Sequence, residues 1–116
     1  MPPQERRRIF SLDEARALLP EVKTVTAGAV RLVEDLTARL QKAAETDSAR
    51  ASIESSIEDA IRDWSRAIGQ LGLEAKGLWL VDFDNGQGYY CWCYPEDTVS
   101  HFHDYDGGFR GRMKIV

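Results

Sequence analysis

Side chains that could bind a metal ion are concentrated near the C-terminal end of the sequence. Cys91 and Cys93 are separated by one residue, and so are His101 and His103. Because alternate residues of a strand point to the same side of a sheet, each pair would present its two side chains together. Two thiolates and two imidazoles form an acceptable tetrahedral zinc site. The candidate metal ligands are therefore Cys91, Cys93, His101 and His103, and zinc is the candidate cofactor.

Whether the two pairs meet depends on the turn between their strands. A three-residue turn at Pro95 would place Cys91 opposite His101, and all four side chains would share one face. A turn of two or four residues would place Cys91 opposite Phe102 and separate the pairs. The spacing also differs from that of known zinc fingers. Buried structural cysteines and hydrogen-bonded histidines are the more frequent explanation of such residues.

Acidic and basic side chains in the same region suggest further chemistry. A histidine beside a carboxylate, as at His103, could act as a general base. Arg112 follows a glycine, and together with Arg110 it could bind an anionic ligand. Turns are naturally rich in aspartate, however, and pairing of Arg112 with Glu96 or Asp82 is the simpler explanation. No serine lies in a nucleophile-elbow sequence, so no catalytic residue is assigned.

Two helices are expected to precede this region. Ser11 and Glu14 have the spacing of a capping box, and apolar residues then recur at intervals of three and four as far as Leu40. Pro20 interrupts this stripe, so the first helix either bends there or is divided into two helices. A second apolar stripe occupies residues 53–71 after a short polar turn. The two helices are therefore predicted to pack as a long antiparallel hairpin.

Beyond the helices the apolar period changes to two, which is typical of strands. Asn85-Gly86 predicts a two-residue turn. That turn pairs Val81 with Tyr90 and Trp79 with Trp92. Aromatic side chains would then share one face of the strands and pack on the helices, while the other face would carry the acidic and thiol groups.

The predicted fold class is therefore α+β. A helical hairpin at residues 10–72 is followed by a three-stranded antiparallel β-meander and a glycine-rich tail at residues 73–116. Residues 1–9 are expected to form a flexible leader. Neither half could bury its apolar face alone, so the chain is expected to be a single domain.

Composition restricts the classes of partner. The 116 residues carry a formal net charge of −4, which argues against nucleic acid because phosphate binding requires a basic surface. No apolar segment approaches the roughly 20 residues of a membrane span. Two unpaired cysteines, and an N-terminus without the apolar stretch of a secretory signal, favour a cytoplasmic location.

Short patterns in both halves of the chain are Leu18-Leu19-Pro20, Cys91-Trp92, His103 and Gly108-Phe109-Arg110-Gly111-Arg112. Together they resemble a bacterial family known as domain of unknown function 2203, for which no activity is established. The resemblance implies a polar ligand-binding site at Asp82, Cys91, Trp92, Glu96, His103 and Arg112. Pro95, Cys93 and His101 depart from the family pattern. The last two departures favour this smaller site over a four-ligand zinc site.

Two kinds of function agree with these observations. Extra apolar positions on the first helix, at Val25, Val30 and Val33, could face a second copy of the chain. A non-catalytic interaction module that self-associates through the hairpin as a homodimer is therefore favoured. The alternative is a protein that binds a metal ion or small ligand on the C-terminal sheet and could be hydrolytic.

Overall fold

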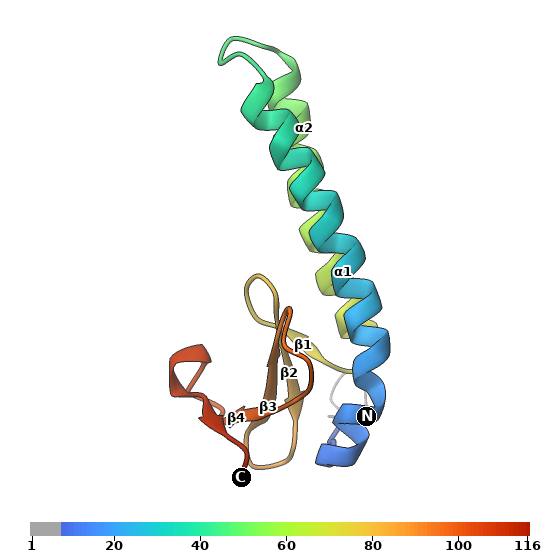
Figure 1. Cartoon of the computed structure of the whole chain (residues 1–116), viewed down its shortest axis with the longest axis vertical. Coiled ribbons are helices and arrows are strands. Elements are labelled where there is room, and N and C mark those ends of the chain that lie inside the picture. Colours follow the sequence, from blue (N-terminus) through green and yellow to red (C-terminus); the bar gives the residue numbers. More distant parts are fainter. Residues whose placement is uncertain (1–7) are drawn as a thin grey trace, which may run out of the picture.

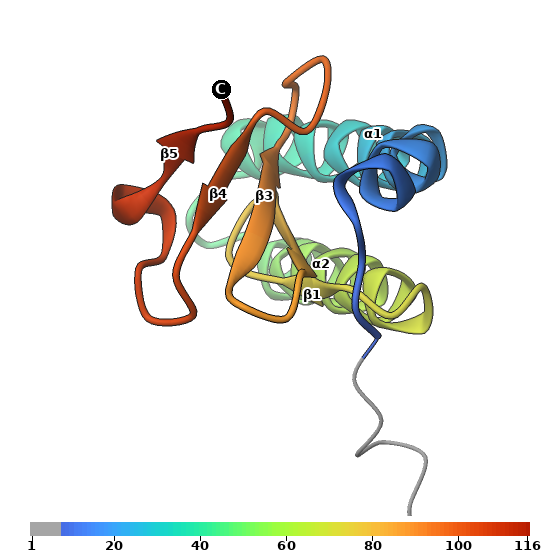
Figure 2. The same ribbon diagram turned by 90° about the horizontal axis from the view of Figure 1, so that it is seen from below.

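The structure, a computed structural model, describes residues 8–116 and has two long helices followed by an antiparallel sheet (Figure 1). The sheet lies against one side of the helical hairpin, near the end at which the first helix begins (Figure 2). This arrangement confirms the predicted α+β class. Most of the predicted flexible leader, residues 1–7, lies outside the described residues. Within the described part, Arg8 Nη1 donates to the carbonyl oxygen of Leu71 at 2.8 Å.

The first helix, α1, spans Leu12–Lys42. It begins with the predicted capping box: the Glu14 amide donates to Ser11 Oγ at 3.1 Å, and the Ser11 amide donates to Glu14 Oε1 at 2.8 Å. The helix continues through Pro20, so the predicted alternative of two separate helices is wrong. The neighbouring Leu19 is buried in the core, which stabilises the helix where proline removes a hydrogen bond. A bend at Pro20 stays a prediction.

The second helix, α2, spans Ala49–Gln70 and packs antiparallel to α1 (Figure 1). Arg50 closes the turn between them, because its Nη1 donates to the carbonyl oxygens of Leu40 at 2.9 Å and Ala43 at 3.1 Å. Carbonyl groups at a helix end have no partner inside the helix, and Arg50 supplies one. Within residues 8–116, neither helix is both long enough and apolar enough to cross a bilayer.

The sheet has five strands in the order β1-β2-β3-β4-β5, and every neighbouring pair is antiparallel. The predicted three-stranded meander corresponds to the three central strands, so the predicted number is wrong. Each of the two edge strands contains only two residues, too few to show an alternating pattern in the sequence. A 3₁₀ helix, η2, precedes the last strand. The bounds are β1 Glu74–Ala75, β2 Leu80–Asp84, β3 Tyr89–Cys93, β4 His101–His103, η2 Phe109–Gly111 and β5 Met113–Lys114.

The register of β2 and β3 differs by two residues from the predicted one. Val81 pairs with Trp92 rather than with Tyr90, because the connecting loop comprises residues 85–88 and not two residues alone. Asn85 makes the longer loop: its Oδ1 accepts the amides of Gln87 at 2.9 Å and Gly88 at 2.8 Å. A shift of two residues leaves every side chain on its predicted face.

The side of the sheet that faces the helices is apolar. Val81, Phe83 and Trp92 are fully buried there and belong to one core with Trp64 and Ile68 of α2. The predicted packing of the aromatic face on the helices is therefore confirmed. The other half of the hairpin, which contains the α1–α2 turn, extends beyond the sheet (Figure 1).

A buried hydrogen bond between the helices offers a test of this core. Trp64 Nε1 donates to Thr26 Oγ1 at 2.9 Å, and both residues are buried. We expect Thr26→Val, which keeps the side-chain shape, to leave the indole N–H without an acceptor and to lower the free energy of unfolding by about 1–3 kcal/mol. Urea unfolding measures the change. Thr24→Val is the control, since Thr24 is exposed on the same helix and should change the stability by less than about 0.5 kcal/mol.

Candidate metal-binding site

Asp82, Cys91 and His103 come together on the outer face of the sheet, the face directed away from the helices. Asp82 and Cys91 are direct cross-strand partners on β2 and β3. His103 on β4 pairs with Tyr89, so it lies diagonally from Cys91 and its ring reaches across β3 towards Asp82. The three residues are only 3%, 1% and 3% exposed, respectively. Three groups of different chemistry are thus buried side by side.

These side chains are close enough together to hold a metal ion after small movements. One ligand atom from each of the three residues lies within 4.8 Å of the other two. The ligand atoms of a tetrahedral zinc ion are separated by roughly 3.5 Å, given bonds of about 2.0–2.3 Å. His103 Nε2 and Asp82 Oδ1 are already 3.1 Å apart. Small side-chain movements would therefore place all three around one ion.

The contacts of His103 require a proton or a cation between its Nε2 and the carboxylate of Asp82. Its Nδ1 is 2.7 Å from the carbonyl oxygen of Asp104, and a carbonyl can only accept, so Nδ1 carries a hydrogen. Its Nε2 faces the carboxylate of Asp82, which is also an acceptor when ionised. Either a proton or a metal ion must lie between these two atoms. A hydrogen bond from Nδ1 to a backbone carbonyl is the usual support of a metal-bound histidine.

Close backbone packing positions the imidazole. A Cβ added at Gly88 would lie 2.5 Å from the carbonyl oxygen of His103, so only glycine allows the end of the β2–β3 loop to approach β4 this closely. The ring of Tyr89 is 5.4 Å from the ring of His103, and the ring of Tyr105 is 5.1 Å from that of Tyr89. Tyr105 is itself held by a 2.7 Å hydrogen bond to Asp84 Oδ1. The two tyrosines therefore form one wall of the site.

Burial raises the pKa values of the thiol and the phenol at this site. It raises the pKa of Cys91 from 9.0 to about 12; the neighbouring Asp82 raises it further, whereas Arg112 opposes the shift. Burial is also the main cause that raises the pKa of Tyr89 from 10.0 to about 12, followed by its hydrogen bond to Glu74. Without a cation Cys91 is therefore a thiol near neutral pH.

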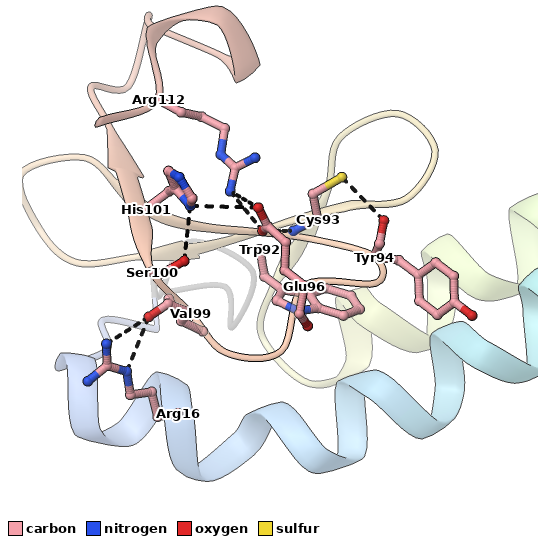
Figure 3. A network of polar contacts seen from close by, with 9 residues as sticks. All are labelled: Arg16, Trp92, Cys93, Tyr94, Glu96, Val99, Ser100, His101 and Arg112. Carbon is pink, nitrogen blue, oxygen red and sulfur yellow. Dashed lines mark hydrogen bonds and ion pairs between the residues drawn. The ribbon is translucent and has the colours of Figure 1, made fainter. Parts of the chain in front are cut away.

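A second polar network on the sheet is centred on Glu96 (Figure 3). Arg112 Nη2 donates to both Glu96 carboxylate oxygens at 2.7 Å, and the Cys93 amide donates to Glu96 Oε1 at 2.8 Å. His101 Nδ1 is 3.1 Å from Ser100 Oγ and 3.7 Å from Glu96 Oε2. The Cys93 thiol lies 3.5 Å from the carbonyl oxygen of Tyr94. This network attaches the β3–β4 loop to the segment that precedes β5.

The structure divides the residues that the sequence singled out. Among the four candidate metal ligands, Cys91 and His103 belong to the buried cluster, whereas Cys93 and His101 belong to the Glu96 network. The open question of register is answered in favour of Cys91 opposite His101. The two histidines nevertheless have different partners, so the four side chains do not form one group in residues 8–116.

The six candidate ligand-binding residues are divided in the same way. Asp82, Cys91 and His103 form the cluster, and Glu96 and Arg112 form an ion pair. Trp92 lies in the core on the opposite face of the sheet, and its Nε1 donates to the carbonyl oxygen of Glu96 at 2.8 Å.

Sequence reasoning did not identify the wall of the site. Tyr89, Tyr105, Lys76 and Phe109 line a cavity of about 150 Å³ beside the three clustered residues. Strand alternation does place Tyr89, two positions before Cys91, on the same face as Asp82 and Cys91, but it does not indicate that Tyr89 lines a cavity. Lys76 and Phe109 lie in short segments without a regular pattern, and only the folded chain brings them there.

The raised pKa values predict a loss of stability in alkali. The unfolded chain releases the Cys91 proton near pH 9.0, whereas the folded protein keeps it to about pH 12, so stability is complete below pH 9 and falls as the pH rises through this range. The slope is up to about 1.4 kcal/mol per pH unit for this one thiol. Urea unfolding of metal-free protein at several pH values measures it. Cys91→Ala should have a shallower pH dependence; equal slopes in the two proteins would contradict the assignment.

Comparison with known families assigns the chain to a family and gives no function for it. Residues 8–115 match the family described as "Uncharacterized conserved protein (DUF2203)". Neither a curated protein nor a solved structure matches the chain. Because the matched region covers almost the whole sequence, this protein belongs to the DUF2203 family.

Proposed function

We propose that this protein binds a divalent transition metal ion, in the first place Zn²⁺, through Asp82, Cys91 and His103. The observation that carries the proposal is the position of His103, whose Nδ1 faces a backbone carbonyl while its Nε2 faces a buried carboxylate. A metal ion bound to Nε2, Oδ1 and the Cys91 thiolate would satisfy all three groups at once.

The types of ligand favour zinc. Thiolate and imidazole bind zinc well, and a carboxylate is an accepted third ligand, whereas Mg²⁺ and Ca²⁺ prefer sites made of oxygen alone. The charges also agree, because one thiolate and one carboxylate balance a divalent ion. Structural zinc sites have four protein ligands, and three ligands leave a position for water or a substrate. The proposed site is therefore of the kind that binds or activates a small molecule.

A buried proton offers the competing explanation. His103 and Asp82 could form an ion pair with a proton on Nε2, and Cys91 could remain a small buried thiol. Such a pair would be a structural element with no metal affinity. The two explanations differ in what replacement of one histidine does to metal content, and the chain supplies a matched control on the same strand.

The metal content of tag-free protein tests the proposal. We expect about one Zn²⁺ per chain by elemental analysis after incubation with zinc and removal of the excess. His103→Ala should lose the ion, whereas His101→Ala, on the same strand but outside the cluster, should keep it. Cys91→Ser and Cys93→Ser form a second matched pair, with the same expected difference. Circular dichroism confirms that each variant is folded; less than a tenth of an equivalent in folded wild-type protein would refute the site.

Val30 is buried within the single chain and Val25 packs against its core, so the predicted homodimer needs another apolar surface. The half of the hairpin beyond the sheet carries apolar side chains that a single sheet does not cover: Ile53 and Ile57 are half-buried, and Leu32 is 49% exposed. Two such hairpins could pack as a four-helix bundle. Self-association is therefore our second proposal, and it is independent of the metal site.

Light scattering tests self-association. We expect a dimer at micromolar concentration that Leu32→Lys shifts towards monomer, because a charge would then be buried in the contact. Ala38→Lys is a control, since Ala38 is exposed on the same helix. A wild-type monomer at 100 micromolar, or an equal effect of both variants, would contradict a dimer formed at Leu32.

A further inference from the structure

We infer that the open position of a metal ion bound at Asp82, Cys91 and His103 takes a small oxyanion, such as a phosphate or carboxylate group, and that Lys76 recognises its negative charge. This inference rests on the proposed metal site and names the class of ligand that would complete it. Three features of the cavity beside the site carry it: its size, the charges along its wall and the place of Lys76.

The cavity is small. Its volume of about 150 Å³ is well below the roughly 300–1,000 Å³ of pockets that enclose drug-sized molecules. Leu80, Phe109 and the two tyrosines restrict its sides. The group that reaches the metal therefore has only a few heavy atoms, either as a free ion or as the end of a larger molecule.

The charges of the site allow an anionic ligand, for which Lys76 is the positive partner. A divalent ion with one thiolate, one carboxylate and one neutral imidazole has no net charge. A ligand in the open position must donate an electron pair to the metal, which excludes an ammonium group there. Among the described residues that line the cavity, the basic ones are His103 and Lys76. Asp106 also lines the cavity, and its negative charge would weaken the binding of an anion.

Lys76 and the proposed ligand His103 line the same cavity, with Tyr89 next to both. The Lys76 Nζ is 5.8 Å from the ring centre of Tyr89, whose ring is 5.4 Å from that of His103. The Nζ also contacts Glu74 Oε1 at 3.2 Å, in a pair whose side chains are 50% and 45% exposed. Because such exposed ion pairs are weak, the ammonium group can exchange Glu74 for an anion bound in the cavity.

Cobalt-substituted protein allows the test, since the visible spectrum of bound Co²⁺ reports changes in its ligands. Protein loaded with one Co²⁺ and freed of excess metal is titrated separately with inorganic phosphate and with acetate, which represent the two sources of an oxyanion. We expect at least one of them to change the spectrum saturably. Lys76→Met should weaken its binding about fivefold to tenfold, and Asp106→Asn should strengthen it about twofold to fivefold.

Lys114→Met is the control for net charge, because Lys114 is exposed on the edge strand β5 and does not line the cavity. It should leave the anion affinity within a factor of two. All variants should bind Co²⁺ as the wild type does, since none replaces a proposed ligand. The inference is overturned if Co²⁺ binds and neither anion alters the spectrum, or if Lys76→Met and Lys114→Met have equal effects. Absence of Co²⁺ binding would instead refute the proposed metal site.

Discussion

The alternation of side chains along β2, β3 and β4 is the constraint on which the rest of the structure depends. On the side towards the helices, Phe83 and Trp92 are fully buried, and this packing fixes the face of each strand. A slip of one residue would expose these rings and bury polar groups in the core. Hydrophobic packing on one face therefore determines where Asp82 and Cys91 lie on the other. Burial of these polar groups is costly by itself, and the apolar core offsets that cost.

The Glu96 network supports the site without taking part in it. Glu96 belongs to the β3–β4 loop, and Arg112 directly precedes β5, so their ion pair joins two segments that are distant in sequence. Between His103 and Arg112 the chain supplies Tyr105 and Phe109 to the wall of the cavity. Since this loop begins at a buried histidine and ends at a partly buried ion pair, both of its ends are held in place. The ion pair of Glu96 and Arg112 therefore holds one end of the loop that lines the cavity.

The sequence predicted the elements that are long enough for an apolar pattern to repeat. The apolar stripes and the Ser11 cap predicted both helices, and alternation predicted the two faces of the central strands. The register of the first strand pair was not predictable from Asn85-Gly86 alone, because the Asn85 side chain closes a longer loop. The two edge strands are too short to produce an alternating pattern in the sequence. They form because the folded chain brings these segments beside the central strands.

The sequence predicted which types of residue form the candidate site, but not which side chains contact one another. Cys91 and His103 were identified because thiol and imidazole groups can bind metal ions, and the alternation placed Asp82 on the face of Cys91. His101 and Cys93 had the same features and nevertheless pair elsewhere. Spacing within a strand fixes the face on which a side chain lies, while a long side chain such as histidine can still reach either neighbouring strand. Only the contacts of Glu96 and Asp82 distinguish the two histidines.

A metal ion at this site would connect three adjacent strands, and two opposing effects would then set its contribution to stability. An ion that binds only the folded chain adds to the free energy of unfolding, by about 2.7 kcal/mol at a free concentration one hundred times the Kd. Binding must also release the proton of Cys91, whose pKa burial raises to about 12, and this release weakens affinity as the pH falls. The same raised pKa lowers the stability of the metal-free fold above pH 9. Metal binding should therefore stabilise the sheet most where the metal-free protein begins to lose stability, because the bound ion keeps the thiolate that the empty site cannot hold.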